Sequence, residues 1–247
     1  MRRLLLTTAL AGAALFATSA AKAQDVQLNS WAYGSGENAT IATAPDATLD
    51  GDAVFDGQIV LNLTGPGGMI NLPTWCTDVY NWQQTTGQYF VQDPLTWNGT
   101  SDNGVTALQN AQIGWLMTNF SGTNSPSGEF GAATQLAIWQ TEYGSSNFTL
   151  VAGSGDDDNI QATATILEAD AVTNAGASAT VAGLIPDPTG SCSVSIAPPC
   201  GTGNQTQSFV FTTTGGGGNL VPEPASMTLL GAGLAGLAAL QRRKARR

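Results

Sequence analysis

The chain has 247 residues, and 11% of them are charged, against about 25% in ordinary soluble domains. It contains no histidine, which excludes Ser-His-Asp and Cys-His nucleophilic catalysis and leaves no imidazole ligand for zinc, copper or iron. All eight Lys and Arg residues lie within residues 1–23 and 242–247, so residues 24–221 hold no basic residue and 17 of the 18 acidic ones. A segment with this negative charge repels phosphates, and we expect no nucleic-acid partner.

The first 23 residues have the three parts of a secretory signal peptide. A basic start at Arg2 and Arg3 is followed by an apolar run over residues 4–16 and by a small-residue site at residues 21–23. We therefore expect cleavage before Gln24 and export of the mature protein.

In the body of the protein, residues 24–221, two segments alternate apolar and polar side chains as half-buried strands do. In residues 58–64 a branched apolar side chain recurs at every second position, and in residues 208–212 Phe209 and Phe211 share one side. These segments lie near the two ends of the body, and we expect them to belong to one sheet system.

Between these strands the apolar spacing changes to that of helices. It predicts helices over residues 104–120, 131–143 and 159–173, with capping candidates at residues 101–103 and a C-terminal stop at Gly144. The fold predicted is α+β, a β-sandwich or barrel-like sheet with a helical subdomain inserted between about Gly104 and Thr173. The domain spans residues 24–214, and a Gly-rich linker follows at 215–221.

Three consecutive acidic residues, 156–158, stand just before the third predicted helix. They lack the alternating oxygen-ligand spacing of a calcium loop, so we favour capping and stabilisation of the helix dipole over calcium binding. We expect no metal ion and no cofactor.

The three cysteines leave one without a partner in an oxidising compartment. Cys192 and Cys200 enclose a short loop rich in turn residues, and we expect them to form a disulfide. Cys76 is then left over in a predicted strand over residues 74–80, where aromatic and β-branched neighbours shield the sulfur. The simplest interpretation is a buried, unreactive thiol.

The second predicted helix contains a glutamine among apolar residues. Gln135 lies three and four residues before Ile138 and Trp139, so its amide sits beside apolar side chains rather than clearly facing water. A buried amide needs hydrogen-bond partners or a function.

Trp75-Cys76 and the run Gln-Leu-Ala-Ile-Trp at residues 135–139 together resemble the Cys-Gln thioester domains of bacterial surface adhesins, best known from Gram-positive bacteria. The resemblance implies an internal thioester between the Cys76 sulfur and Gln135 Cδ, formed with loss of ammonia. It also implies one covalent attachment to a partner's amine, so we expect no enzyme. The residues expected to shield the thioester from water are Trp75, Ile138, Trp139 and Tyr80.

The body without lysine is consistent with this chemistry, because no internal amine competes for the acyl group. A general drift of secreted proteins toward acidic, Gly/Ser/Thr/Asn-rich composition explains the same absence equally well. Both explanations stay open.

The C-terminal tail, residues 222–247, has three ordered parts. Val221-Pro222-Glu223-Pro224 precedes an uncharged run over residues 225–240, which is shorter than the ~20 residues of a comfortable membrane helix, and an Arg-rich end follows. The tail resembles the PEP-CTERM sorting signal of Gram-negative bacteria that secrete exopolysaccharide. The resemblance implies cleavage by an exosortase and delivery to the cell surface or matrix, with transient anchoring by a short transmembrane helix; a permanent single-span anchor is the alternative.

The leading functional hypothesis is an exported surface or matrix protein that attaches covalently to an amine-bearing partner, with exopolysaccharide as a further candidate partner. The alternative is a non-covalent matrix or carbohydrate-binding module that stacks sugars on Trp31, Trp82 or Trp97. A hydrolase that uses an acid pair such as Asp50 and Asp52 ranks third, because nothing distinguishes these two from the other acids.

Overall fold

The computed structural model describes residues 25–65, 68–79, 87–96, 104–120, 127–153, 155–176, 181–186 and 207–212. All of them belong to one compact unit, Ala23–Val221. Several predicted features lie outside these residues: the signal peptide, the Gly-rich linker, the sorting tail, the disulfide between Cys192 and Cys200, the capping candidates at 101–103, and Tyr80, Trp82 and Trp97.

Antiparallel strands form a sheet whose pairings run in a ring. The described strands are β1 (Asp25–Thr43), β2 (Ala53–Gly65), β3 (Gly68–Cys76), β4 (Gly87–Gln92), β5 (Thr149–Leu150), β6 (Val181–Pro186) and β7 (Phe209–Thr212). Their order is β2-β3-β7-β6-β4-β1-β5, and β1 also pairs with β2, so the ring passes through β1, β2, β3, β7, β6 and β4. The predicted α+β fold with a barrel-like sheet is confirmed, and β7 joins the sheet that β2 begins.

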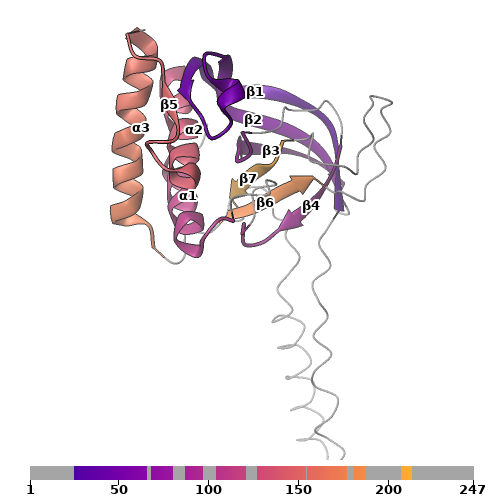
Figure 1. Cartoon of the computed structure of the whole chain (residues 1–247). Coiled ribbons are helices and arrows are strands. Elements are labelled where there is room, and N and C mark those ends of the chain that lie inside the picture. The colour runs from indigo at the N-terminus through magenta and orange to yellow at the C-terminus, as the bar shows by residue number, and fades with distance from the viewer. Residues whose placement is uncertain are drawn as a thin grey trace, which may run out of the picture. The chain divides into compact units, whose positions relative to one another are not determined.

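The two longest strands, β1 and β2, are bent by a bulge. Gly34 and Ser35 of β1 face the single residue Gln58 of β2, because the register shifts between Tyr33 and Gly36. Such a bulge bends the strand and raises its local twist. The bend carries β1 and β2 away from the ring and along the helices (Figure 1).

The part of the chain that the structure describes has three α-helices near the predicted positions, with shifted starts: α1 (Ala107–Phe120), α2 (Gly128–Tyr143) and α3 (Gly155–Asn174). Helix α1 begins later than predicted because the Val105 N–H donates to Thr96 O (2.8 Å) and so is not part of the helix. Thr106 precedes the first turn, and its Oγ1 accepts from the Gln109 N–H (3.2 Å). Helix α2 begins earlier, since Ser127 Oγ accepts from the Phe130 N–H.

The ends of α2 and α3 also follow local chemistry. Helix α2 stops at Gly144, whose φ of 95° suits a glycine, as predicted. The acidic residues 156–158 lie in the first turn of α3 rather than before it. Their negative charges still interact favourably with the positive end of the helix dipole. Among the described residues, no helix is long and apolar enough to cross a membrane.

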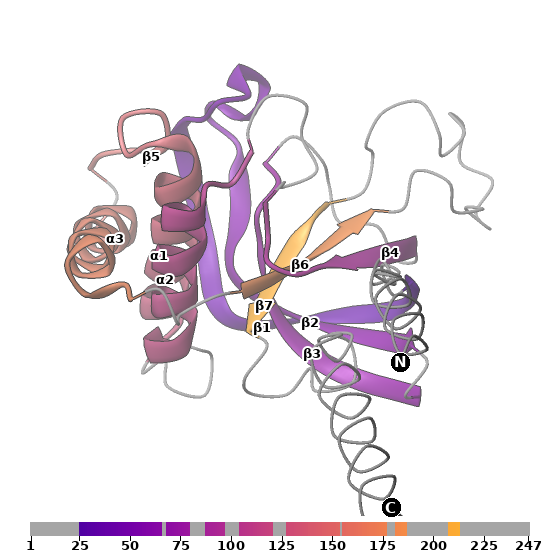
Figure 2. The same cartoon turned by 90° about the horizontal axis from the view of Figure 1, so that it is seen from below.

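Helix α2 is the central helix of the fold. It packs against β1 and β2 on one side and against α1 and α3 on the other. Helix α3 lies outermost among the helices and also contacts β5 and β1 (Figures 1 and 2). Every residue from Gly131 to Tyr143 is consequently buried, including the polar side chains of that stretch. A helix buried on all sides has little amphipathic pattern of its own.

A glycine sets how closely α2 approaches the sheet. A Cβ atom on Gly131 would lie 2.5 Å from the backbone oxygen of Ser35, in the bulge of β1. Backbone atoms cannot move aside to make room for a Cβ atom as the end of a flexible side chain can. Gly131 therefore holds α2 against β1 one helical turn before Gln135.

We expect Gly131→Ala to destabilise the protein by about 1–3 kcal/mol, because the added methyl group forces α2 away from Ser35. Urea denaturation would measure the loss. Gly155→Ala is the matched control, since nothing lies within 4 Å of the Cβ position there. A neutral Gly131→Ala would show that α2 can shift freely.

Candidate functional site

Cys76 and Gln135, 59 residues apart in the sequence, meet through two hydrogen bonds. The Cys76 backbone N–H donates to Gln135 Oε1, and Gln135 Nε2 donates to the Cys76 carbonyl oxygen, both at 2.8 Å. Gln135 is 0% exposed and Cys76 is 4% exposed. The buried amide is therefore satisfied on both of its polar atoms by one backbone residue.

The end of β3 explains why the Cys76 backbone is free to bind a side chain. Pairing between β3 and β2 stops at Thr74 and Ile59. On the other edge, Thr77 N–H donates to Ser208 O (3.1 Å), and successive residues of a strand point their polar groups to opposite edges. The Cys76 N–H and C=O thus face the edge that β2 has left, where α2 supplies Gln135. The predicted strand over residues 74–80 is present only to Cys76.

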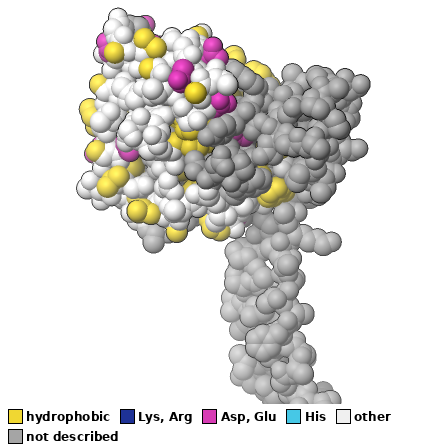
Figure 3. All heavy atoms as spheres, viewed as in Figure 1, with side chains coloured by type: hydrophobic (Ala, Val, Ile, Leu, Met, Phe, Trp, Pro, Cys, Tyr) yellow, Lys and Arg dark blue, Asp and Glu magenta, His cyan; other side chains and the backbone are white. Residues whose placement is uncertain are grey.

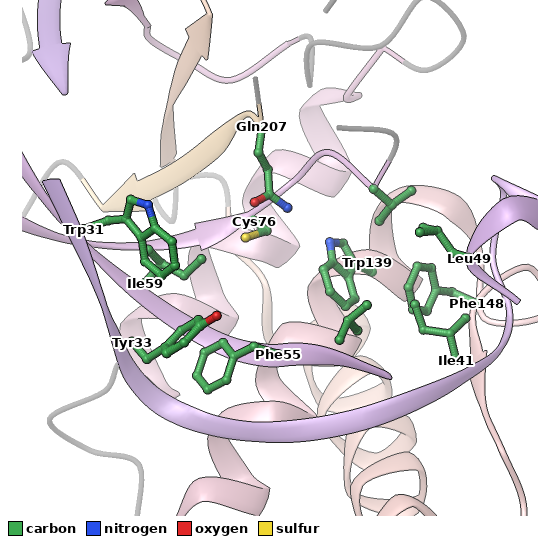
Figure 4. A pocket seen from close by; sticks show the side chains of 12 residues that line it. Trp31, Tyr33, Ile41, Leu49, Phe55, Ile59, Cys76, Trp139, Phe148 and Gln207 are labelled. Atoms are coloured by element: carbon green, nitrogen blue, oxygen red, sulfur yellow. The ribbon is translucent and has the colours of Figure 1, made fainter. Parts of the chain in front are cut away.

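Cys76 also lines an apolar cavity of about 110 Å³. In Figure 4 the cysteine lies between Trp31, Tyr33 and Phe55 on one side and Trp139 and Phe148 on the other. The remaining lining residues are Ile41, Leu49, Val54, Ile59, Val79 and Gln207.

Of the residues predicted to shield the site, those that the structure describes are buried. Trp75, Ile138 and Trp139 are at most 4% exposed. Trp139 stacks on the Phe148 ring at a centroid distance of 4.8 Å, and both line the cavity with Cys76. The surroundings of Cys76 are therefore largely apolar.

The acid pair of the hydrolase hypothesis lies apart from this cavity. Asp50 and Asp52 are exposed, and Asp50 Oδ1 accepts a hydrogen bond from the Ala44 N–H (3.1 Å). Neither residue lines the cavity. Within the described part of the chain, no cluster of three or more His, Cys, Asp or Glu side chains could hold a metal ion.

Sequence reasoning missed one unusual acid near Cys76. Asp56 of β2 is 0% exposed, and neither of its carboxyl oxygens has a hydrogen-bond partner. Burial, and secondarily the charge of Asp157, raises the pKa of Asp56 well above its usual range, so the group favours its neutral form. Its signal in the sequence is an acid inside a strand segment, between Phe55 and Gly57.

The Cys76 thiol lies in the field of several acids. Burial raises the pKa of Cys76 well above its usual range, and the charges of Asp56, Asp78 and Glu142 raise it further. Tyr89 of β4 is also close: its buried hydroxyl has no hydrogen-bond partner, and burial followed by the charge of Cys76 raises the pKa of Tyr89. Cys76 is accordingly a protonated thiol at neutral pH, not a thiolate.

Asp56 makes stability depend on pH. Because the pKa of Asp56 is higher in the folded state, its contribution is fully present below the unfolded pKa of about 4 and is lost as pH rises toward the folded pKa. We expect Asp56→Asn, which cannot ionise, to gain stability relative to wild type by about 1.4 kcal/mol for each pKa unit of that shift.

Urea denaturation of both proteins between pH 4 and pH 8 measures this difference. Asp52→Asn, a change at an exposed acid, is the control and should track the wild type. A difference between Asp56→Asn and wild type that stays constant with pH would contradict the raised pKa.

Comparison with known proteins identifies the tail and not the folded domain. Residues 220–244 match the PEP-CTERM protein-sorting motif. No curated protein and no solved structure matches the chain. The match does not reach Cys76 or Gln135, so the thioester stays a hypothesis. The chain is an exported protein with a C-terminal PEP-CTERM sorting signal, which implies processing by an exosortase and delivery to the cell surface.

Proposed function

We propose that this exported protein forms an internal thioester between Cys76 Sγ and Gln135 Cδ and uses it once to attach covalently to an amine of a surface or matrix partner. The observation that carries the proposal is the pair of 2.8 Å hydrogen bonds between the Cys76 backbone and the Gln135 amide. No separate general base or metal ion is part of the proposal.

The hydrogen bond to Gln135 Oε1 favours thioester formation. Cys76 Sγ attacks Gln135 Cδ, the bond from Cδ to Nε2 breaks, and ammonia leaves with the proton of the thiol. Negative charge develops on Oε1 in the tetrahedral intermediate. The Cys76 N–H already donates to that atom at 2.8 Å, which is the position of an oxyanion-hole donor.

The apolar surroundings preserve the product. A thioester hydrolyses when water reaches it, and the cavity wall beside Cys76 is mostly aromatic and aliphatic. The buried Trp75, Ile138 and Trp139 reduce access to water further. The cavity reaches Cys76, and we propose it as the route by which a slender primary amine approaches the bond.

The charge of the body favours an external amine as the acceptor. The amine nitrogen attacks Gln135 Cδ, the thioester bond breaks, and an amide and the Cys76 thiol result. Residues 24–221 contain no lysine to compete with the partner. The described part of the surface in Figure 3 displays acidic side chains and no basic one, so cationic amines are attracted to it.

Intact-mass measurement of the mature protein tests the thioester. We expect a mass lower than the sequence mass by one ammonia, loss of this deficit in Cys76→Ala and in Gln135→Ala, and a methylamine adduct on Gln135 of the wild type. Gln140→Ala is the matched control: Gln140 is another buried amide of α2, but it donates to Phe148 O (2.9 Å). A wild-type protein that has the full sequence mass, and whose Cys76 reacts as a free thiol, would contradict the proposal.

An aromatic cluster beside the cavity favours non-covalent carbohydrate binding as a second candidate function. The Trp31 and Tyr33 rings lie 5.1 Å apart, the Tyr33 and Phe55 rings lie 4.1 Å apart, and Tyr33 is 59% exposed. Exposed rings of this kind stack on sugar faces.

A glycan array separates the two functions. Binding that survives Cys76→Ala and disappears in Trp31→Ala supports the carbohydrate-binding function. Binding that requires Cys76 supports covalent capture, and an array on which neither protein binds removes the second candidate.

A further inference from the structure

The indole N–H of Trp139 is a buried hydrogen-bond donor without a partner in the folded domain. Trp139 is 4% exposed, and none of the described residues accepts a hydrogen bond from its Nε1. A buried tryptophan N–H usually finds a partner, because a buried donor left without one costs free energy. An unsatisfied donor of this kind needs an explanation, and a ligand that carries an acceptor is one.

This N–H belongs to the wall of the cavity beside Cys76. Trp139 and Cys76 both line that cavity of about 110 Å³. Figure 4 shows the indole nitrogen on the edge of the ring that is turned toward Cys76 and Gln207. The ring stacks on Phe148 with 4.8 Å between the centroids and 30° between the planes, which holds its orientation. A molecule in the cavity therefore meets a fixed hydrogen-bond donor.

Trp139 also lies one helical turn from the carbon atom that reacts in the proposed thioester. Gln135 and Trp139 are four residues apart on α2, and side chains at this spacing are neighbours on a helix. The two 2.8 Å hydrogen bonds from the Cys76 backbone hold the Gln135 amide at the same end of β3. A molecule that approaches Gln135 Cδ with one end can thus accept the Trp139 N–H with the other.

These positions define the chemistry that an incoming amine needs. Its nitrogen must be a primary amine that attacks Gln135 Cδ, and it needs an oxygen that accepts from Trp139 Nε1. One helical turn rises about 5.4 Å, and a hydrogen bond covers about 2.9 Å of such a span, so two carbons between nitrogen and oxygen bridge the remainder. A lysine side chain carries no oxygen on its four methylene groups and leaves the N–H unsatisfied.

We propose that the thioester site selects primary amines of the ethanolamine type, with an oxygen two carbons from the nitrogen, and that Trp139 makes this selection. The inference rests on the proposed thioester. The amine nitrogen bonds to Gln135 Cδ, the bond from Cδ to Cys76 Sγ breaks, a proton of the amine passes to the sulfur, and the oxygen keeps its hydrogen bond to Trp139 Nε1. Trp139 is then a specificity residue as well as a shield against water.

The charge of the body assigns the ethanolamine-type group to a matrix polymer rather than to a membrane lipid. Residues 24–221 contain 17 acidic residues and no basic one. This segment is repelled by an anionic membrane surface, whereas an uncharged or cationic polymer can approach it.

Two amines of equal length test the selection by intact mass. 2-Methoxyethylamine has the oxygen acceptor, and butylamine has the four-carbon chain of a lysine side chain. We expect the rate of capture of the ether relative to butylamine to be about tenfold higher on the wild-type thioester than on a simple alkyl thioester in solution, which is the worth of one hydrogen bond. The solution thioester cancels the different basicities of the two amines. A wild type with the solution ratio overturns the selection without any variant.

Trp139→Phe removes the donor and keeps an aromatic ring. We expect its ratio to fall about tenfold, to that of the solution thioester, because no group of the cavity then distinguishes oxygen from methylene at this position. Trp115→Phe of α1 is the matched control, since Trp115 does not line the cavity, and it should keep the wild-type ratio. A Trp139→Phe protein that keeps the wild-type ratio overturns the role of Trp139.

Vesicles of phosphatidylethanolamine and phosphatidylglycerol offer the same amine from a membrane. We expect no adduct of lipid mass under conditions in which free ethanolamine forms one, and a lipid adduct overturns the assignment to a polymer. The failures stay distinct. A wild-type protein of full sequence mass overturns the thioester and the selection together, whereas a wild type with the ammonia deficit and the solution ratio overturns the selection alone.

Discussion

Two hydrogen bonds between the Cys76 backbone and the Gln135 amide tie the end of the sheet to the central helix. They require β3 to end its pairing with β2 at Thr74, and they require α2 to approach the bulge of β1 closely enough for Gly131 to touch Ser35. The bent strands and the glycine contact bring α2 close enough for Gln135 to reach this junction, which is buried. The chemistry proposed for the protein follows from the same junction, because it holds a carbonyl carbon beside a cysteine in dry surroundings.

The burial that protects the site also determines its proton chemistry. It raises the pKa of both the Cys76 thiol and the Asp56 carboxyl, which favours the neutral form of each group. A neutral thiol is a weak nucleophile, so a buried cysteine does not react without help. Asp56 lowers the stability of the folded state at neutral pH, because burial disfavours the charged form of its carboxyl.

Sequence patterns predicted the three described helices and parts of β2, β3 and β7, but they missed β1, β4, β5 and β6 and the exact ends of the elements. Alternation identified β2 and β7, helical spacing identified α1 and α3, and the stop at Gly144 marked the end of α2. The start of α1 was wrong because Val105 forms a backbone hydrogen bond to Thr96, a tertiary contact that no local pattern records. Within the site, the motif indicated Cys76 and Gln135, whereas Asp56 and Tyr89 were missed because nothing local distinguishes a buried acid or phenol from an exposed one.

By itself the sequence determined where the protein goes and which residue types it can use. The C-terminal basic end carries the sorting signal, and the N-terminal one is predicted to carry the export signal. Residues 24–221 between them contain no lysine or histidine that could act as a nucleophile. Only the tertiary structure decided that Cys76 and Gln135 are neighbours and that Asp56 is buried. Hydrophobic periodicity specifies which face of an element is buried, but which buried faces meet depends on strand register, bulges and helix packing across the whole domain.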